Sequence, residues 1–233
     1  MKKELPDLEA EKGLAARRAV DEIRNGMMVG LGTGRTAGYA IREIAKRVAG
    51  GLKITAVATS HATHDLASSL GVPVIPFEHI ARLDLTIDGA DEVDPTLIAM
   101  KGGGGALLRE KIVAAASDRM IVVVDSSKLV AQLGHFPLPV EVLPFACAFV
   151  ERRISERFKI TAKKRVRAEG SIFLTDQNNY ILDLDFSVIN DPAGVTLQLK
   201  SIPGIIEHGL FLTEVDEVFV GRERKVDILR RAG

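Results

Sequence analysis

Short apolar runs alternate with helix-like patterns over the first 130 residues of the chain. The runs are rich in Val, Ile and Leu with little polar alternation, which is typical of strands covered on both faces. We predict strands at Met27–Leu31, Ile54–Ala58, Val72–Ile75, Leu83–Ile87 and Met120–Val124. Apolar residues at helical spacing predict helices over Leu8–Arg24, Tyr39–Val48 and Ala106–Ala116. This order indicates an α/β fold with a doubly wound (Rossmann-like), mostly parallel sheet.

The pattern changes near Leu133, where three prolines fall within the eleven residues GHFPLPVEVLP. Beyond them we predict a helix over Phe145–Phe158, strands over Ile160–Arg167, Ser171–Thr175 and Tyr180–Phe186, a helix over Val195–Lys200 and a strand over Ile205–Leu212. A buried strand is predicted at VDEVFVG near the end. Residues 133–206 are therefore predicted to form a smaller inserted α+β (ferredoxin-like) domain, and residues 1–132 plus 207–233 the Rossmann-like catalytic domain. A succession of two separate domains explains the same pattern nearly as well.

Charge and composition narrow the class of protein. The chain has 31 basic and 31 acidic side chains, and the resulting zero net charge argues against a nucleic-acid partner. The short basic run KKRVR, residues 163–167, is interpreted as the solvated face of a strand. No run of about 18 apolar residues occurs, which argues against a membrane partner. The single cysteine, Cys147, is interpreted as a buried apolar filler, and we expect a cytoplasmic protein.

The first motif with chemical content is GLGTGRTA, residues 30–37, which follows a predicted strand and opens a helix. Its glycines let backbone N–H groups turn toward an anion at the helix N-terminus. A dinucleotide site would also need Asp or Glu about 20 residues later, whereas residues 58–63 read ATSHAT and offer hydroxyls. The motif therefore favours a phosphate without an attached adenosine. A tight turn without a ligand is the alternative.

The second motif is DLTIDGADEVD, residues 84–94, which places several carboxylates directly after a buried strand. Ligands of open parallel sheets bind outside the carboxyl ends of the strands, so Asp88 and Asp91 are candidate substrate contacts. Crowded carboxylates also suit proton transfer, because mutual repulsion raises the pKa of one of them. The spacing lacks the alternation of a calcium loop. A solvated acidic turn is the alternative.

The third motif is KGGGGALLREK, residues 101–111. Four consecutive glycines are unfavourable in backbone entropy, which indicates that something approaches the backbone closely. Lys101 lies at the start of this loop, and Glu110 falls in the second turn of the predicted helix after it. The two residues offer a fixed cation and a candidate base. For Glu110 alone, a surface acid paired with a lysine is the alternative.

Taken together and in this order, the three motifs resemble those of the type A ribose-5-phosphate isomerase family. The resemblance continues through Ser127–Lys128 and Leu133–Pro144, and more loosely to the end of the chain. It implies an enzyme that interconverts D-ribose 5-phosphate and D-ribulose 5-phosphate in the non-oxidative branch of the pentose phosphate pathway. It also implies that no cofactor or metal is needed, that the partner is a small sugar phosphate, and that the protein is a homodimer or homotetramer.

The resemblance also implies roles for individual residues. The general base corresponds to Glu110, and the other catalytic residues to Asp88, Asp91 and Lys101. The implied substrate contacts are Thr33, Gly34, Arg35, Thr36, Asp88, Gly89, Ala90, Asp91, Lys101, Gly102, Gly103, Gly104 and Lys128. Arg35 departs from the family pattern, which has serine there, so a guanidinium contact to phosphate or a solvent-facing side chain are both open. Lys12 is a further candidate phosphate ligand.

Two other classes compete with this interpretation. A non-catalytic sugar-phosphate sensor would use the same kind of fold but has no need of Glu110. A nicotinamide dehydrogenase would need the ribose-binding acid that the sequence lacks. Among the five histidines, His61 and His64 have helical spacing but no adjacent carboxylates in sequence, so they are interpreted as surface or substrate-loop residues and not as metal ligands.

Overall fold

In a computed structural model of the chain, which describes residues 6–231, the contacts divide the protein into two compact units. The first unit consists of residues up to Ala90, Arg109–Leu129 and the residues from Thr213 onward. The second unit consists of Asp91–Leu108 and Val130–Leu212. One boundary between the units, at 108/109, falls inside the helix Leu107–Ala115.

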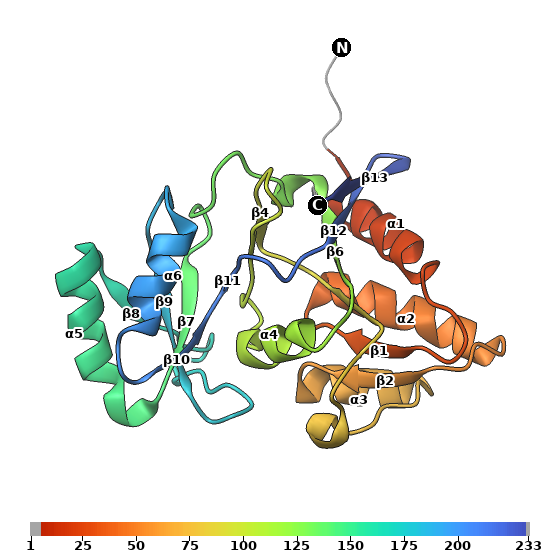
Figure 1. Cartoon of the computed structure of the whole chain (residues 1–233), viewed down its shortest axis with the longest axis horizontal. Helices are drawn as coiled ribbons and strands as arrows, with labels where there is room; N and C mark the ends of the chain where they lie inside the picture. The colour runs from red at the N-terminus through yellow and green to blue at the C-terminus, as the bar shows by residue number, and fades with distance from the viewer. Residues whose placement is uncertain (1–5, 232–233) are drawn as a thin grey trace, which may run out of the picture. The chain divides into compact units, whose positions relative to one another are not determined.

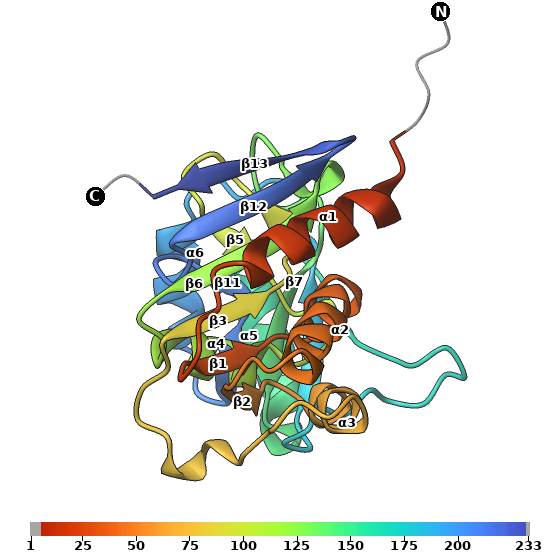
Figure 2. The same cartoon turned by 90° about the vertical axis from the view of Figure 1, so that its right-hand side faces the viewer.

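The first unit is built on a six-stranded sheet in the order β13-β12-β6-β3-β1-β2 (Figures 1 and 2). Its strands are β1 (Met28–Leu31), β2 (Thr55–Ala58), β3 (Leu85–Asp88), β6 (Met120–Asp125), β12 (Glu217–Arg222) and β13 (Lys225–Arg230). All neighbouring pairs are parallel except the β12–β13 hairpin. The helices of this unit are α1 (Leu8–Val20), α2 (Arg35–Ala49), α3 (His61–Ser69) and most of α4 (Leu107–Ala115).

Both faces of this sheet are covered. Val29 and Leu31 of β1 belong to one hydrophobic cluster with residues of α1 and α2. Gly30 faces the other way, toward Val113 of α4, which belongs to a separate cluster. Double burial explains why these strands are continuous apolar runs, and the predicted α/β fold with a mostly parallel sheet is confirmed.

One predicted strand of this sheet is wrong. Val72–Ile75 forms no strand, and only Val74 makes a parallel bridge, to Ala56. Pro73 and Pro76 flank this bridge and have no N–H to donate, so the pairing does not extend. The remaining predicted strands of the first half are present, within a few residues of the predicted ends.

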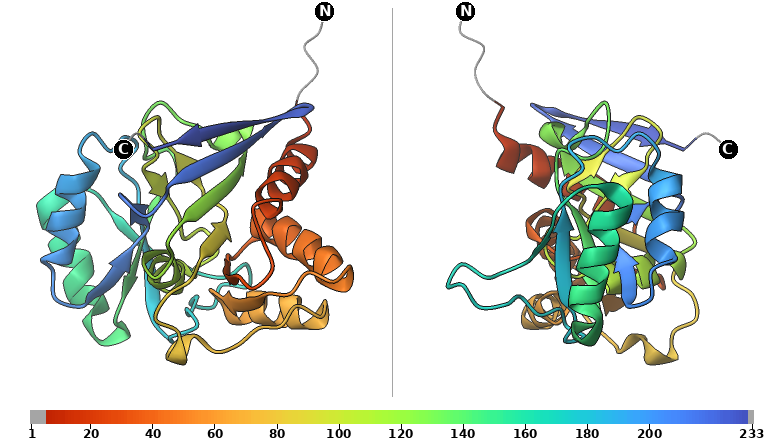
Figure 3. Two further views of the ribbon diagram at one scale, coloured as in Figure 1. Left: turned by 45° about the vertical axis from the view of Figure 1, so that its right-hand side comes forward. Right: turned by 90° about the vertical axis from the view of Figure 1, so that its left-hand side faces the viewer.

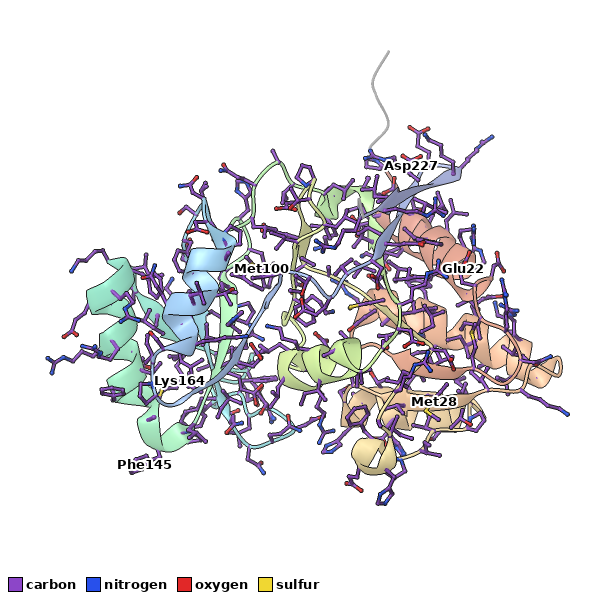
Figure 4. The ribbon with its side chains drawn as sticks, viewed as in Figure 1. Glu22, Met28, Met100, Phe145, Lys164 and Asp227 are labelled. Carbon is purple, nitrogen blue, oxygen red and sulfur yellow. The ribbon has the colours of Figure 1, made fainter. Side chains whose placement is uncertain are left out.

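The second unit contains two antiparallel sheets. A four-stranded sheet has the order β10-β7-β9-β8, from β7 (Leu138–Val142), β8 (Ala162–Lys164), β9 (Tyr180–Leu184) and β10 (Ile205–His208). Its helices α5 (Cys147–Phe158) and α6 (Pro192–Lys200) pack on one face, as the views in Figure 3 show. A smaller sheet joins β4 (Glu92–Val93), β5 (Ala99–Met100) and β11 (Leu210–Phe211). Met100, labelled in Figure 4, is fully buried in the core of this unit.

Strand β7 lies inside the segment that the prolines mark as a boundary. Leu138, Val140 and Val142 alternate as a strand should and are fully buried, so the prolines concealed a central strand. The predicted strand Ser171–Thr175 is also wrong, because only Ile172 makes a bridge, to Val166.

The contacts group some residues differently from the sequence-based domain boundaries of 1–132 plus 207–233 and 133–206. Asp91–Leu108 belongs with the second unit, because β4 and β5 pair with β11. The breaks fall at 129/130 and 212/213. The division into two folding domains stays a prediction.

Candidate active site

The loop from β1 to α2 contains glycines that close packing requires. A Cβ on Gly30 would lie 2.0 Å from the Thr86 hydroxyl, and one on Gly32 would lie 2.0 Å from Asp88 Oδ1. Gly34 has φ +103°, a conformation that side chains other than glycine rarely adopt. The loop therefore lies directly against the end of β3.

Asp88, the last residue of β3, is fully buried and holds this loop. Its Oδ1 accepts hydrogen bonds from the backbone N–H groups of Thr33, at 3.0 Å, and Gly89, at 2.7 Å. The structure thus brings together three of the residues predicted as substrate contacts. The neighbouring Ala90 continues the same segment and is half-buried.

A cluster of hydroxyls surrounds the Thr33 side chain. Its Oγ1 lies 2.8 Å from Thr59 Oγ1, 2.8 Å from Ser60 Oγ and 3.1 Å from Thr63 Oγ1. Thr63 Oγ1 in turn donates to the Gly32 carbonyl at 2.8 Å. In the sequence these hydroxyls stand where a ribose-binding acid would be, and nothing there indicates that they fix the first glycine loop.

Arg35 opens helix α2 and is exposed. Hydrogen bonds from Lys12 and then Tyr39 hold the pKa of Glu9 below its ordinary value, and the charge of Arg35 adds a smaller attraction to that carboxylate. The positive end of the helix dipole lies at the N-terminus and favours an anion there, so it repels the Arg35 cation in the first turn. Thr36 is half-buried, next to Gly89.

Glu110 lies in α4 and is only 3% exposed. This burial contradicts the alternative of a surface acid. Nη2 of the neighbouring Arg109 lies 3.2 Å from Nε2 of His61, the first residue of α3.

Helix α1 supports the turn that carries Lys128. Glu11, 1% exposed, accepts hydrogen bonds from the N–H groups of Ser126, at 2.9 Å, and Glu223, at 3.2 Å. Lys12 is also buried, and its Nζ lies 2.6 Å from Glu9 Oε1 and 3.8 Å from Asp125. Burial raises the pKa of Glu11, but the hydrogen bonds from Ser126 and Glu223 outweigh it, so the net pKa is lowered.

In the second unit, Lys101 begins the second glycine loop and Asp91 contacts the backbone of that loop. Asp91 Oδ2 accepts the N–H of Gly103 at 2.8 Å. Lys101 is 2% exposed, its backbone N–H donates to the Gly209 carbonyl, and its Nζ lies 5.4 Å from the centre of the Phe211 ring. The ammonium is therefore held in a defined place.

Within that loop, Gly102 and Gly105 have φ values of +106° and +77°, so both need glycine. The Gly102 carbonyl accepts the N–H of Gly105 at 2.9 Å. Gly103 and Gly104 are exposed at the tip. Among residues 6–231, no protein group accepts the N–H of Gly102 or Gly104, which leaves these two as candidate donors to a substrate.

The basic run at residues 163–167 is only partly a solvated face. Lys163 and Arg167 are exposed, but the Arg165 side chain is 13% exposed and forms an ion pair with Asp183. The interpretation is thus wrong for Arg165, because a partner distant in sequence draws this side chain inward.

No group of three or more His, Cys, Asp or Glu residues within 6–231 has the arrangement of a metal site. Over the same part of the chain, none of the helices has the length and apolar character needed to cross a bilayer.

Comparison with known sequences gives a consistent family. The model of ribose 5-phosphate isomerase A (phosphoriboisomerase A) matches residues 55–225. Ribose-5-phosphate isomerase A of Sphingopyxis alaskensis is 56% identical over 223 residues, which cover 95% of this chain and 96% of the relative. Ribose-5-phosphate isomerase A of Listeria monocytogenes is 43% identical over 222 residues, or 95% of this chain and 99% of the relative.

Solved structures agree with this result. Ribose 5-phosphate isomerase A of Methanocaldococcus jannaschii matches with a TM-score of 0.89 and 38% identity, over 94% of this chain and 97% of that one. A D-ribose-5-phosphate isomerase in complex with phospho-erythronic acid matches with a TM-score of 0.93 and 36% identity, over 97% of this chain and 100% of that one.

Proposed function

Because the chain belongs to the ribose 5-phosphate isomerase A family, we propose that it interconverts D-ribose 5-phosphate and D-ribulose 5-phosphate through an enediolate, with Glu110 as the base. The observation that carries this proposal is the burial of Glu110 in a helix that directly follows the glycine loop. A carboxylate that serves only solubility would lie at the surface, whereas a buried carboxylate in this place suits proton transfer. The proposed place of the reaction is the non-oxidative branch of the pentose phosphate pathway.

The reaction moves a carbonyl from C1 to C2, which requires a proton to leave C2 and another to arrive at C1. In the proposal, the Glu110 carboxylate takes the C2 proton and the electron pair forms the enediolate. A proton then passes from the C2 hydroxyl to the C1 oxygen, and the same carboxyl returns a proton to C1. Both steps use one group in alternating protonation states. Positioned proton transfer of this kind contributes roughly 10² to 10⁴ in rate.

Lys101 is proposed to stabilise the negative charge that develops on the enediolate oxygen. Its ammonium is buried and lies against Phe211, so little reorganisation is needed when the charge appears. The N–H groups of Gly102 and Gly104 are proposed to assist. Asp91 already accepts the N–H of Gly103, which makes it a positioning residue for the loop.

Asp88 is proposed to assist opening of the furanose ring, which must release the aldehyde before isomerisation. Its Oδ1 accepts the N–H groups of Thr33 and Gly89, which fixes the position of the carboxylate for this proton transfer. The loop of residues 33–36 with Lys128 is proposed to bind the phosphate. Phosphate binding far from the reacting carbons supplies orientation.

Further expectations belong to the same proposal. The scheme includes no step through a metal or cofactor, the protein is expected to act as a homodimer or homotetramer, and its expected location is the cytoplasm. Addition of a divalent ion to chelator-treated protein should therefore leave turnover unchanged.

The test is a coupled assay for ribulose 5-phosphate formed from ribose 5-phosphate, run on the wild type and on Glu110→Gln. The variant should lose about 10² to 10⁴ in kcat while it still binds phospho-erythronic acid in a calorimetric titration. Glu156→Gln, at a half-exposed position on α5, is the matched control and should keep full activity. Unchanged turnover in Glu110→Gln would refute the base, and ligand binding without turnover in the wild type would favour a sensor.

A further inference from the structure

A hairpin of the second unit, residues 165–173, contacts the second glycine loop although it lies far from that loop in the sequence. It follows β8, where Lys164 is labelled in Figure 4, and protrudes from the four-stranded sheet in Figure 3. Arg165 is held at its base, because its N–H donates to the Ile181 carbonyl at 2.8 Å and its carbonyl accepts the Phe173 N–H at 3.0 Å. The side chains of Arg165 and Phe173 both reach the loop.

The ion pair with Asp183 fixes the Arg165 guanidinium. Its Nε donates to Asp183 Oδ2 at 2.9 Å, and its Nη2 donates to Oδ1 of the same carboxylate. This two-point pairing fixes the plane of the guanidinium. Both side chains are largely buried, with 13% and 23% of their surfaces exposed.

The third nitrogen of Arg165 binds the loop itself. Nη1 donates to the carbonyl of Gly102 at 2.8 Å and to that of Gly103 at 3.2 Å. Asp91 accepts the N–H of the same Gly103 at 2.8 Å. Gly103 is therefore held by a carboxylate on one side of its backbone and by a guanidinium on the other.

Phe173 closes the contact at the end of the loop. A Cβ on Gly105 would lie 2.4 Å from the tip of the Phe173 ring, so the ring rests directly on the glycine backbone. The ring also lies under Arg165, whose guanidinium carbon is 5.8 Å from its centre. Two side chains of one hairpin thus restrain both ends of the run of four glycines, residues 102–105.

We propose that Arg165, fixed by Asp183, is a positioning residue that holds the Lys101–Gly104 loop in the conformation used for isomerisation. This inference rests on the proposed function. Without the restraint, four glycines would sample many conformations, and the entropy lost on ordering them would raise the free-energy barrier in each catalytic cycle. With it, the N–H groups of Gly102 and Gly104 and the Lys101 ammonium keep fixed directions. Lysine can replace arginine here only in part, because one ammonium cannot pair with Asp183 at two points and also reach two carbonyls.

The test compares Arg165→Met, Arg165→Lys and the control Arg167→Met. Arg167 is an exposed arginine two residues away, and its guanidinium lies 6.0 Å from the centre of the same Phe173 ring. Turnover of ribose 5-phosphate gives kcat and KM, and amide hydrogen exchange followed by mass spectrometry reports on residues 101–106. Exchange across β7 and β9 reports on the rest of the unit.

Arg165→Met should lower kcat by about 10- to 100-fold, because misplacement of a catalytic group by about 1 Å has an effect of this size. KM should change much less, and exchange should rise in residues 101–106 but not in β7 or β9. Arg165→Lys should show the same pattern to a smaller degree, and Arg167→Met should match the wild type. Arg165→Lys also keeps the test valid if Arg165→Met fails to fold.

Two results would overturn the inference. One is wild-type kcat and loop protection in a folded Arg165→Met or Arg165→Lys protein. The other is a rise in exchange spread equally over the whole second unit, which would assign Arg165 a purely structural role. An inactive wild type would instead refute the proposed function, while the exchange measurement would still report whether Arg165 orders the loop.

Discussion

The two glycine-rich loops are held in different ways. The loop after β1 lies against the end of β3, where Gly32 leaves no room for a Cβ beside Asp88 and a cluster of hydroxyls surrounds Thr33. The loop before α4 contains glycines with positive φ, and hydrogen bonds to Asp91 and to the guanidinium of Arg165 hold it in place. The first loop is part of a packed core, whereas the second is restrained by a few polar contacts.

Because the two loops are held differently, substitutions in them should have different effects. A change in the first loop should disturb the core around it, so stability and activity should fall together. A change at the contacts of the second loop should alter the direction of backbone groups with a smaller loss of stability. Substitutions in each loop test whether stability and activity separate in this way.

The largest effect is expected for Gly32→Ala. The added methyl would lie 2.0 Å from Asp88 Oδ1 and would force apart β1 and β3. We expect a loss of about 3 kcal/mol in the free energy of unfolding, at the upper end of overpacking effects, and loss of most turnover. Urea denaturation and the coupled assay measure the two.

The control for this substitution is Gly13→Ala in α1. There the nearest atom to the new Cβ would be Arg17 Nη1 at 3.5 Å, an ordinary contact. This variant should be stabilised by about 0.5 to 1 kcal/mol through helix propensity. If Gly32→Ala were equally well tolerated, the close packing of the first loop would be refuted.

A smaller loss is expected for Gly105→Ala in the second loop. Its φ of +77° should cost roughly 1 to 2 kcal/mol with any side chain, and the methyl would also collide with Phe173. The double variant Gly105→Ala/Phe173→Ala should remove the collision and keep the backbone strain. Denaturation midpoints of the two single variants and the double variant measure this coupling. Strict additivity would show that the ring does not rest on Gly105.

Thr33→Val should remove the hydroxyl at the centre of the first loop's polar cluster. Thr59, Ser60 and Thr63 would each lose a partner, which should destabilise the protein by about 1 to 2 kcal/mol. Thr33→Ser restores the hydroxyl and should recover most of the loss in thermal unfolding. A valine variant as stable as the wild type would show that the cluster does not hold the loop.

The smallest effect is a pH dependence in the first unit. The net pKa of Glu11 is lowered, since the hydrogen bonds from Ser126 and Glu223 outweigh burial, so its carboxylate stabilises the fold above the unfolded-state pKa of about 4.3. That contribution is lost as pH falls through the lower, folded-state pKa. Glu11→Gln should therefore lose about 1 kcal/mol at pH 7, and the difference from wild type should shrink below pH 4. A difference that grew in acid would have the wrong sign.

Much of the first unit follows from local sequence. Continuous apolar runs such as Met120–Val124 identify strands buried on both faces, and the position of the first glycine motif after a strand identifies its loop. Asp88 and Glu110 were identified by motif and resemblance, and both are buried.

Long-range contacts explain what the sequence left open. Arg165 lies 63 residues from the Gly102 carbonyl that it binds, and nothing in KKRVR distinguishes it from its exposed neighbours. Strand β7 was concealed by its prolines, since proline removes a ladder hydrogen bond and usually argues against a central strand. Tertiary partners decided both cases.

The proposed transfer of a proton by Glu110 between C2 and C1 through an enediolate can be followed by running the reaction in D₂O and detecting deuterium at carbon by NMR. The wild type should incorporate deuterium at C1 of ribulose 5-phosphate, and Glu110→Gln should incorporate it at least about 10²-fold more slowly. Incorporation by Glu110→Gln at the wild-type rate would contradict this role of Glu110.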